Sequence, residues 1–355
     1  MPPPTPIPQL NWRKDDIEQD KSLPPINWDA LRRYATTTRR QLAGVDSPCR
    51  LSPEYNKGGL HVVRRIDFEV NLQWLARLQL TPPTPESCQG LLNEVHAMAA
   101  VRSRSKIPVP QVFDHDATGE SGVGVAFMLT EFIPGDTAMD SFGGYEVHHG
   151  ETPAQFRDKF HAALADIQTE ITSIRFSKIG AIVVTRDGEF DVGPIPNIGG
   201  PFDTAADYLE AWARTARFPY KEATIRPRTP AHLVDGCRSW LGASRSKTGP
   251  FRSSTRTSTA ATSIIDEEYN ILSVVDWENA FVGPWELVEF NKELSIVPPA
   301  MDGPLFKETE QWMAMEVARA DYVKLVQRAE EKGHLDTRLS TVLSDEALQA
   351  FAHAF

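Results

Sequence analysis

The first third of the chain has the hydrophobic pattern of a small sheet with one helix. GLHVVRRIDFE, from residue 59, and NLQWLARLQL, from residue 71, alternate apolar and polar residues, which predicts two strands joined by a short turn. A helix is expected next, because Thr84 is a candidate N-cap followed by Pro85, and apolar residues then recur at helical spacing. The prolines of KIPVPQVFDHD predict an extended segment and GVAFMLTEFIPGD predicts another strand, so residues 55–134 are expected to fold as β-β-α-β-β.

The rest of the chain has the pattern of a mainly helical unit. Apolar residues between 156 and 174 recur every three or four positions, which is typical of an amphipathic helix. FDTAADYLEAWARTA predicts a second helix with Asp203 as its candidate cap, and residues 308–333 and 344–354 are expected to be helical as well. ILSVVDW, from residue 271, is short and strongly apolar, which favours a buried strand.

These elements divide the chain into an arm and two lobes. Residues 1–25 are rich in proline and charge and are expected to form a mobile arm that packs locally through Trp12. Residues 26–134 are expected to form a β-rich N-terminal lobe, and residues 135–355 a larger, mainly helical C-terminal lobe, with a linker near 131–136. The expected fold class is therefore α+β, with two lobes.

The amino-acid composition argues against nucleic acids and membranes as partners of this protein. The formal net charge is −11, which argues against a nucleic-acid binder or a membrane-surface protein, because both need a basic face. The three cysteines, at 49, 88 and 237, are far apart and form no C-x-x-C motif, which favours a reduced, cytoplasmic protein. The sequence shows no secretory signal and no apolar run of 18 residues, so we expect no membrane partner. A monomer or weak dimer is the working expectation, although no feature of the sequence decides the oligomeric state.

The position of Asp276, directly after an apolar strand, is the most specific local signal of a functional site in the sequence. It follows the apolar stretch at 271–275 directly, and an ionised carboxylate at the end of a buried strand is costly unless a cation or hydrogen-bond donors compensate it. Mg²⁺ held by one carboxylate together with substrate phosphates is one solution. A carboxylate that caps the following turn is an equally good explanation of this feature alone.

Arg77 is the second candidate, because it places a cation in the middle of the apolar strand WLARLQL. Glu94 follows on the next predicted helix. Two-lobed kinases use such a pair, in which the cation holds the α- and β-phosphates of ATP and the glutamate fixes the cation. The alternative is an exposed arginine on an alternating strand and a solvated glutamate.

Several separate blocks between residues 50 and 300 resemble the fungal aminoglycoside-phosphotransferase-like, or choline-kinase-like, proteins. The blocks are GGLHVV, WLARLQL, NEVHAMAAVRSRSKIPVPQV, FMLTEFIPGD, SIRFSKIGAIVV, FDVGPIPNIGGPF and VVDWENAFVGPWE. The resemblance implies a protein-kinase-like fold and ATP-dependent phosphorylation of a hydroxyl on a small molecule, with ATP and Mg²⁺ as cofactors. It also implies that Asp276, in DWE, binds the metal, that Arg77 contacts phosphate and that Glu94 is its partner on the helix.

The same resemblance assigns the remaining nucleotide contacts. Glu131, Phe132 and Ile133 match the inter-lobe linker, whose backbone is expected to hydrogen-bond the adenine. Gly58 and Gly59 stand where the family's phosphate-covering loop turns. This last match is the least specific, because two adjacent glycines are common in any turn.

The family's catalytic loop, H-x-D-x-x-x-x-N, is missing. Its Asn is expected 14 residues before Asp276, which is Thr262, inside the Ser/Thr-rich tract FRSSTRTSTAATSIID. Thr255, Thr257 and Thr262 have the relative positions of the loop His, Asp and Asn. In the family the Asp orients the attacking hydroxyl and the Asn binds metal.

A local frameshift explains this coincidence. Every Thr codon is ACN, and read one base early it becomes NAC, which encodes His, Asp, Asn or Tyr. With permitted codons, RSSTRTSTAATS read one base early gives L-V-H-A-D-F-H-S-S-N-I, a well-formed loop of this family. The hypothesis is therefore that a short frame change has replaced the catalytic loop, and the alternative is a genuine Ser/Thr-rich loop.

Three functions follow from the sequence. The family function is small-molecule phosphotransferase, expected to be weak or absent in this polypeptide because Thr supplies no carboxylate. A catalytically inactive, pseudokinase-like nucleotide-binding or scaffold protein is the alternative. A metal hydrolase is a third and weaker candidate. His148 and His149 are adjacent, and neighbouring side chains rarely bind the same metal ion, while His96, His115 and His161 do not have the spacing of metal ligands.

Overall fold

The computed structural model describes most of the chain in seven stretches. They are residues 12–13, 16–69, 72–148, 151–215, 251–252, 263–294 and 310–354. Thr255, Thr257 and Thr262 lie outside them. No helix within these stretches is long and apolar enough to cross a membrane.

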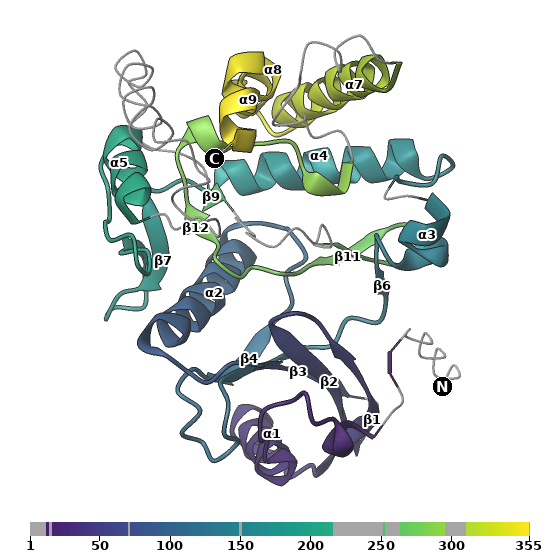
Figure 1. Cartoon of the computed structure of the whole chain (residues 1–355), viewed down its shortest axis with the longest axis vertical. Helices are drawn as coiled ribbons and strands as arrows, with labels where there is room; N and C mark the ends of the chain where they lie inside the picture. The colour runs from purple at the N-terminus through teal and green to yellow at the C-terminus, as the bar shows by residue number, and fades with distance from the viewer. Residues whose placement is uncertain are drawn as a thin grey trace, which may run out of the picture.

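The N-terminal part is a five-stranded antiparallel sheet with one helix on each face (Figure 1). The strands are β1 (Cys49–Lys57), β2 (His61–Phe68), β3 (Gln73–Gln79), β4 (Val112–Asp116) and β5 (Phe127–Glu131), in the spatial order β1-β2-β3-β5-β4. Helix α1 (Trp28–Ala43) packs on one face, and α2 (Pro85–Arg104) joins β3 to β4 across the other. The predicted order of two strands, one helix and two strands is confirmed, as is the Thr84 cap, whose hydroxyl accepts a hydrogen bond from Ser87 N at 3.2 Å.

Two elements of this part were not predicted. Helix α1 begins after Asn27, whose side-chain oxygen accepts from Ala30 N at 3.0 Å, and ends at Gly44, where φ is +67°. Strand β1 carries a bulge between Leu51 and Tyr55, so that every third residue is buried instead of every second. This irregularity removes the alternation by which a strand is recognised in a sequence.

The C-terminal part combines two small sheets with helices. One sheet has the order β11-β10-β6 and the other β8-β7-β12-β9. Their strands are β6 (Asp136–Thr137), β7 (Gly180–Val184), β8 (Phe190–Gly193), β9 (Phe251–Arg252), β10 (Ser263–Ile265), β11 (Ile271–Val274) and β12 (Phe281–Val282). In Figure 1, β6, β11 and β12 lie between the N-terminal sheet and the helices at the top of the view, and the α+β class and the two-part arrangement are confirmed.

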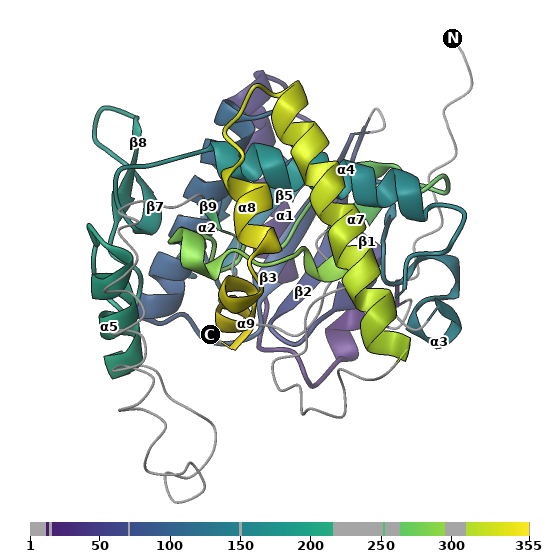
Figure 2. The same ribbon diagram turned by 90° about the horizontal axis from the view of Figure 1, so that it is seen from above.

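The helices of this part pack around two further hydrophobic clusters. They are α3 (Tyr145–His148), α4 (Arg157–Ser173), α5 (Ala205–Thr215), α7 (Glu310–Lys332), α8 (Arg338–Ser344) and α9 (Glu346–Ala354). Figure 2 shows α7 crossing over α4, and buried side chains of both helices, Phe160, Leu164, Tyr322 and Val326 among them, share one hydrophobic cluster. The amphipathic helix expected at 156–174 and the helices expected at 308–333 and 344–354 are confirmed as α4, α7 and α9, whereas α8 was not predicted.

The proposed cap of α5 was wrong by one residue. The hydroxyl of Thr204 accepts from Asp207 N at 3.1 Å and donates to the Asp207 carboxylate at 2.7 Å. Asp203 instead lies 3.7 Å from the Lys178 ammonium. Asp and Thr are both common caps, so the sequence could not distinguish two adjacent candidates.

The N-terminal arm is tied to the sheet at several points. Arg13 and Tyr55 exchange two backbone hydrogen bonds, of 2.8 and 3.1 Å, along the edge of β1. The ring of Trp12 meets that of Phe132 edge-on at 6.1 Å, so Trp12 packs on the segment that follows β5. Ile17 is buried among the residues that α1 and the sheet share.

A buried carboxylate fixes the start of β10, the strand that follows the Ser/Thr-rich tract. Ser263 N donates to one oxygen of Glu293 at 2.8 Å, and the Ser263 hydroxyl donates to the other at 2.6 Å. Both residues are buried. Because hydrogen bonds to a buried charge are among the strongest in a protein, this contact should determine where the strand enters the sheet.

Replacing Glu293 by alanine tests this contact. We expect Glu293→Ala to lower the free energy of unfolding by about 3 kcal/mol, because it leaves two buried donors on Ser263 without their acceptor. Urea denaturation at pH 7 measures the change. The matched control is Glu267→Ala, on the exposed turn of the same hairpin, which should change stability by less than about 0.5 kcal/mol, and equal effects of the two substitutions would contradict the assignment.

Candidate functional site

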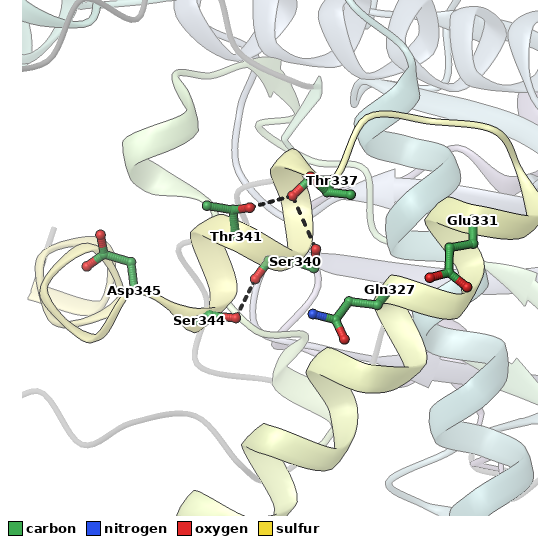
Figure 3. Close-up of a pocket in the computed structure, with 7 residues that line it drawn as sticks. All are labelled: Gln327, Glu331, Thr337, Ser340, Thr341, Ser344 and Asp345. Atoms are coloured by element: carbon green, nitrogen blue, oxygen red, sulfur yellow. Dashed lines mark hydrogen bonds between the residues drawn. The ribbon is translucent and has the colours of Figure 1, made fainter.

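A polar hollow between α7 and α8 does not carry the predicted chemistry. Its lining consists of Gln327, Glu331, Thr337, Ser340, Thr341, Ser344 and Asp345 (Figure 3). The three hydroxyls of α8 donate to helix carbonyls, for example Thr341 to Thr337 O at 2.6 Å. These donors are thus engaged in the helix itself, and none of the predicted site residues lies here.

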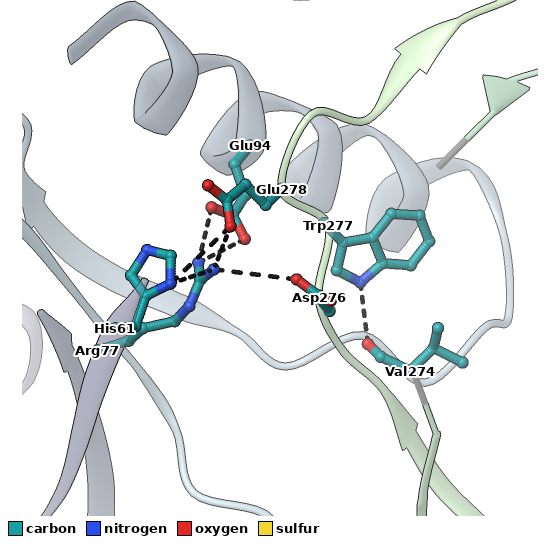
Figure 4. Close-up of polar contacts among 7 residues, drawn as sticks. All are labelled: His61, Arg77, Glu94, Val274, Asp276, Trp277 and Glu278. Carbon is teal, nitrogen blue, oxygen red and sulfur yellow. Dashed lines mark hydrogen bonds and ion pairs between the residues drawn. The ribbon is translucent and has the colours of Figure 1, made fainter. Parts of the chain in front are cut away.

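The predicted residues Arg77, Glu94 and Asp276 meet at another place, between the two parts of the molecule (Figure 4). Nη1 of Arg77, on β3, donates to both oxygens of Glu94, on α2, at 2.7 Å each. Nη2 of Arg77 lies 4.0 Å from Oδ1 of Asp276 and 3.3 Å from Oε2 of Glu278. It also lies 3.2 Å from Nδ1 of His61, on β2. One guanidinium therefore joins four other side chains.

Strand alternation explains why Arg77 faces α2. Its neighbours Ala76 and Leu78 are fully buried on the opposite face, against α1, so Arg77 must point to the side that α2 covers. On α2, Glu94 lies one turn from the buried Leu91 and Ala97 and is itself only 4% exposed. The alternative of a solvated arginine and glutamate is thus wrong, and the two form a buried ion pair.

The backbone at Asp276 turns its carboxylate toward Arg77. Asp276 has a φ of +67°, a left-handed conformation that costs a non-glycine residue on the order of 1 kcal/mol. The next residue, Trp277, is buried, and its indole Nε1 donates to Val274 O at 2.9 Å. The anchored indole fixes the chain on one side of Asp276, so the carboxylate is held beside the guanidinium. The Asp276 carboxylate thus lies 4.0 Å from a cation of the protein itself, the guanidinium of Arg77.

Charge is unbalanced in this cluster. Burial raises the pKa of Asp276, Glu278 and Glu94 above their ordinary values, and in each case the nearby guanidinium of Arg77 opposes the rise. Burial disfavours the charge on Arg77 as well, but the three carboxylates outweigh it and raise the Arg77 pKa. Burial, aided by the positive charge of Arg77, lowers the pKa of His61 to about 3, so the imidazole is neutral near pH 7.

This arrangement fits a magnesium ion held together with phosphate. Three carboxylates face one guanidinium, so one more cation would improve the charge balance, and carboxylate oxygens are ligands that Mg²⁺ prefers. Asp276 is 26% exposed and thus remains accessible from one side. Among the residues that the structure describes, no three carboxylate, imidazole or thiol groups form a metal centre by themselves. Phosphate oxygens would therefore have to complete the coordination shell.

The linker residues have partners within the protein. Glu131 N donates to Gln111 O at 2.8 Å, and Gln111 N donates to the Glu131 carboxylate at 3.2 Å. The N–H of Glu131 is thus engaged, so a contact from Glu131 to an adenine would have to use its carbonyl. Phe132 is buried under Trp12, and Ile133 follows it toward β6.

Gly58 and Gly59 form the turn between β1 and β2. Gly58 N donates to His61 O at 2.9 Å, which closes the turn. An added Cβ at Gly59 would meet no neighbouring atom within 4 Å. Lys57, at the start of the turn, lies 4.0 Å from the Asp20 carboxylate of the N-terminal arm. The turn is open on its outer side and tied to the arm at its base.

The three threonine positions of the expected catalytic loop cannot be placed, because they lie outside the described residues. The described chain resumes at Ser263, in β10. Ser263 pairs with Val274, two residues before Asp276. The chain therefore enters β10 directly beside the strand that leads to Asp276.

Sequence reasoning missed two members of the cluster, His61 and Glu278. Glu278 lies two residues after Asp276 in the block DWE, and this spacing could have indicated a second carboxylate at the same place. His61 is the first residue of β2, and nothing in its sequence surroundings distinguishes it from other strand histidines. Only the pairing of β2 with β3 brings it to Arg77.

Arg77 should contribute more to stability than Glu94 does. We expect Arg77→Met to lower the free energy of unfolding by about 3–5 kcal/mol, because it leaves three carboxylates packed together without a cation. Glu94→Gln should cost only about 1–2 kcal/mol, because Asp276 and Glu278 still balance the guanidinium. Urea denaturation measures both changes, with Arg40→Met, which breaks an exposed pair with Asp46, as the control. A larger loss in Glu94→Gln than in Arg77→Met would contradict this account.

Comparison with known proteins gives distant structural likenesses only. No protein-family model matches the chain, and no curated protein matches it. Among solved structures, a Ralstonia eutropha protein provisionally described as an aminoglycoside phosphotransferase is 15% identical, with a TM-score of 0.49 over 93% of this chain and 95% of that one. A type I macrolide 2′-phosphotransferase is 13% identical, with a TM-score of 0.46 over 93% and 99% of the two chains. An aminoglycoside phosphotransferase in complex with ADP and hygromycin B is 14% identical, with a TM-score of 0.47 over 91% and 92%.

Proposed function

We propose that this chain carries the nucleotide site of an ATP-dependent phosphotransferase of the aminoglycoside-phosphotransferase-like family, whose reaction is the phosphorylation of a hydroxyl on a small molecule. One observation carries the proposal. Arg77, Glu94 and Asp276 come from β3, α2 and the segment after β11, and they converge within 4.0 Å. Such a cation, its buried carboxylate partner and a further carboxylate are the parts that a kinase-like site needs for the phosphates and metal of ATP.

Each side chain has a defined task in this proposal. Arg77 holds a phosphate of the nucleotide, and Glu94 keeps the guanidinium in place through its two 2.7 Å hydrogen bonds. Asp276 would hold Mg²⁺, and the positive φ at Asp276 directs its carboxylate into the site. When bound, Mg²⁺ would neutralise charge on the phosphates. Glu278 now contacts Arg77, and an arriving phosphate would compete with it for Nη2.

The adenine and phosphate contacts complete the nucleotide site. In this proposal the backbone of the linker, at Glu131, Phe132 and Ile133, binds the adenine, with Glu131 contributing its carbonyl because its N–H is engaged. The turn at Gly58 and Gly59 covers the phosphates. The boundary between the two lobes is placed at residue 134.

The proposed protein is cytoplasmic, and its substrate is a small molecule. It acts as a monomer or weak dimer.

Catalysis is a separate matter from nucleotide binding. The loop Asp, His and Asn of the family are expected at Thr257, Thr255 and Thr262, and threonine offers neither a carboxylate nor an imidazole. We therefore propose that this polypeptide binds nucleotide but transfers phosphate weakly or not at all, because of a local frameshift. Ser263 has two buried hydrogen bonds to Glu293, which supports placing the end of any altered segment before Ser263. Sequencing the transcript across codons 236–268 tests the frameshift directly.

The metal prediction concerns Asp276. We expect Mg²⁺ to strengthen ADP binding to the unaltered protein about tenfold, a typical coupling between two ligands that share a site. Asp276→Asn should remove most of this enhancement, because it removes the charged ligand. Calorimetric titration with ADP, with Mg²⁺ and then with EDTA, measures the enhancement. Asp266→Asn, on the neighbouring hairpin turn, is the matched control, and an enhancement that survives Asp276→Asn would refute the metal role.

The catalytic prediction concerns the three threonines. Thr255→His, Thr257→Asp and Thr262→Asn, combined in one variant, should raise ATP turnover with hydroxylated amines about 100-fold or more, because they supply a proton acceptor and a metal ligand. Release of ADP measures turnover, and the same variant with Thr257→Asn is the control. If the variant binds ADP and stays inactive on every hydroxylated compound tried, the nucleotide-binding, pseudokinase-like function is favoured instead.

A further inference from the structure

His61 connects two parts of the proposed nucleotide site. Its carbonyl accepts the hydrogen bond from Gly58 N at 2.9 Å that closes the glycine turn. Its imidazole Nδ1 lies 3.2 Å from Nη2 of Arg77, and the side chain is only 13% exposed. One residue therefore contacts both the turn and the cation that the proposal assigns to the phosphates.

The chemistry of this contact fixes the state of the imidazole. A guanidinium only donates hydrogen bonds, so Nδ1 must present its lone pair to Arg77 and the ring proton must lie on Nε2. A protonated imidazole would place a second positive charge 3.2 Å from Nη2 without a hydrogen bond between them. Oε2 of Glu278 lies 3.9 Å from the same Nδ1, too far to accept a hydrogen bond from it, so the geometry is that of a neutral acceptor.

A neutral acceptor differs in its effect from the carboxylates around it. Glu94, Glu278 and Asp276 orient Arg77 but also cancel its charge, and each would repel a phosphate group. His61 orients Nη2 without cancelling any charge. When a phosphate displaces Glu278, His61 remains as a partner that keeps the guanidinium in place and leaves its positive charge to the phosphate.

We propose that His61 is a positioning residue of the nucleotide site, which aims Arg77 through its imidazole and ties the Gly58–Gly59 turn to Arg77 through its carbonyl. This inference rests on the proposed nucleotide binding. The backbone contact would survive any substitution at position 61, so the side chain can be tested separately. Its loss should weaken the binding of nucleotide phosphates without unfolding the protein.

Two variants separate hydrogen bonding from space filling. His61→Leu removes the acceptor, whereas His61→Asn can place its side-chain oxygen near the position of Nδ1. In calorimetric titrations with ADP, we expect His61→Leu to bind about tenfold more weakly, as the loss of about 1.4 kcal/mol predicts, and His61→Asn to stay within about threefold of the unaltered protein. His115→Leu, on β4 of the same sheet, is the matched control and should leave ADP binding unchanged.

The results also distinguish the failure of this inference from that of the proposed function. If the unaltered protein binds no ADP, the proposed function and the role of His61 fall together. If it binds ADP and His61→Leu binds as tightly, only the role of His61 is refuted. Equal weakening in His61→Leu and His61→Asn, with unchanged melting temperatures, would refute the acceptor role, because the asparagine oxygen would then fail to replace Nδ1.

A spectroscopic measurement tests the contact without any nucleotide. The ¹⁵N chemical shifts of the His61 imidazole at pH 7 should show an unprotonated Nδ1 and a protonated Nε2, and Arg77→Met should change the Nδ1 shift. A protonated Nδ1 in the folded protein would refute the hydrogen bond to Arg77. This readout remains decisive even if His61→Leu does not fold.

Discussion

The buried guanidinium of Arg77 is the constraint on which the centre of this molecule depends. Three carboxylates lie within 4.0 Å of it, and they come from α2 and from the segment after β11. Without a cation, carboxylates buried this closely would repel one another and lose hydration. Arg77 is thus the cation that favours the charged forms of Glu94, Asp276 and Glu278 against their burial, and the two parts of the chain meet around it.

Backbone contacts hold the same junction from another side. Val274 N, at the end of β11, donates to Pro108 O at 2.7 Å, and the Ser273 hydroxyl donates to the same carbonyl at 3.0 Å. The buried indole of Trp277 lies in one hydrophobic cluster with α2 and with strands of the C-terminal part. The residues before and after Asp276 are therefore both held by contacts with the rest of the molecule. The positive φ of Asp276 is a consequence of these contacts.

Local signals were reliable where one element is regular. The Thr84 cap, the amphipathic helix at α4 and the strands β2 and β3 could all be predicted, because each follows a period that the sequence shows directly. The bulge in β1 broke that period, and the adjacent Asp203 and Thr204 offered two equivalent caps for one helix. In both cases the deciding contact comes from backbone geometry that residue types alone do not specify.

The sequence by itself determined the α+β class, the position of Arg77 on an apolar strand, and Asp276 at the end of another, whereas the structure decided that Arg77 is buried. Alternation and helical periodicity fix which side chains face inward, so these features needed no knowledge of distant contacts. The tertiary structure alone decided that His61 and Glu278 join Arg77, because only the pairing of β2 with β3 and the approach of the segment after β11 bring them within 3.3 Å of one guanidinium. The charge balance of the site is a property of that assembled cluster, since the pKa values of Arg77 and Glu278 depend on each other across 201 residues of sequence.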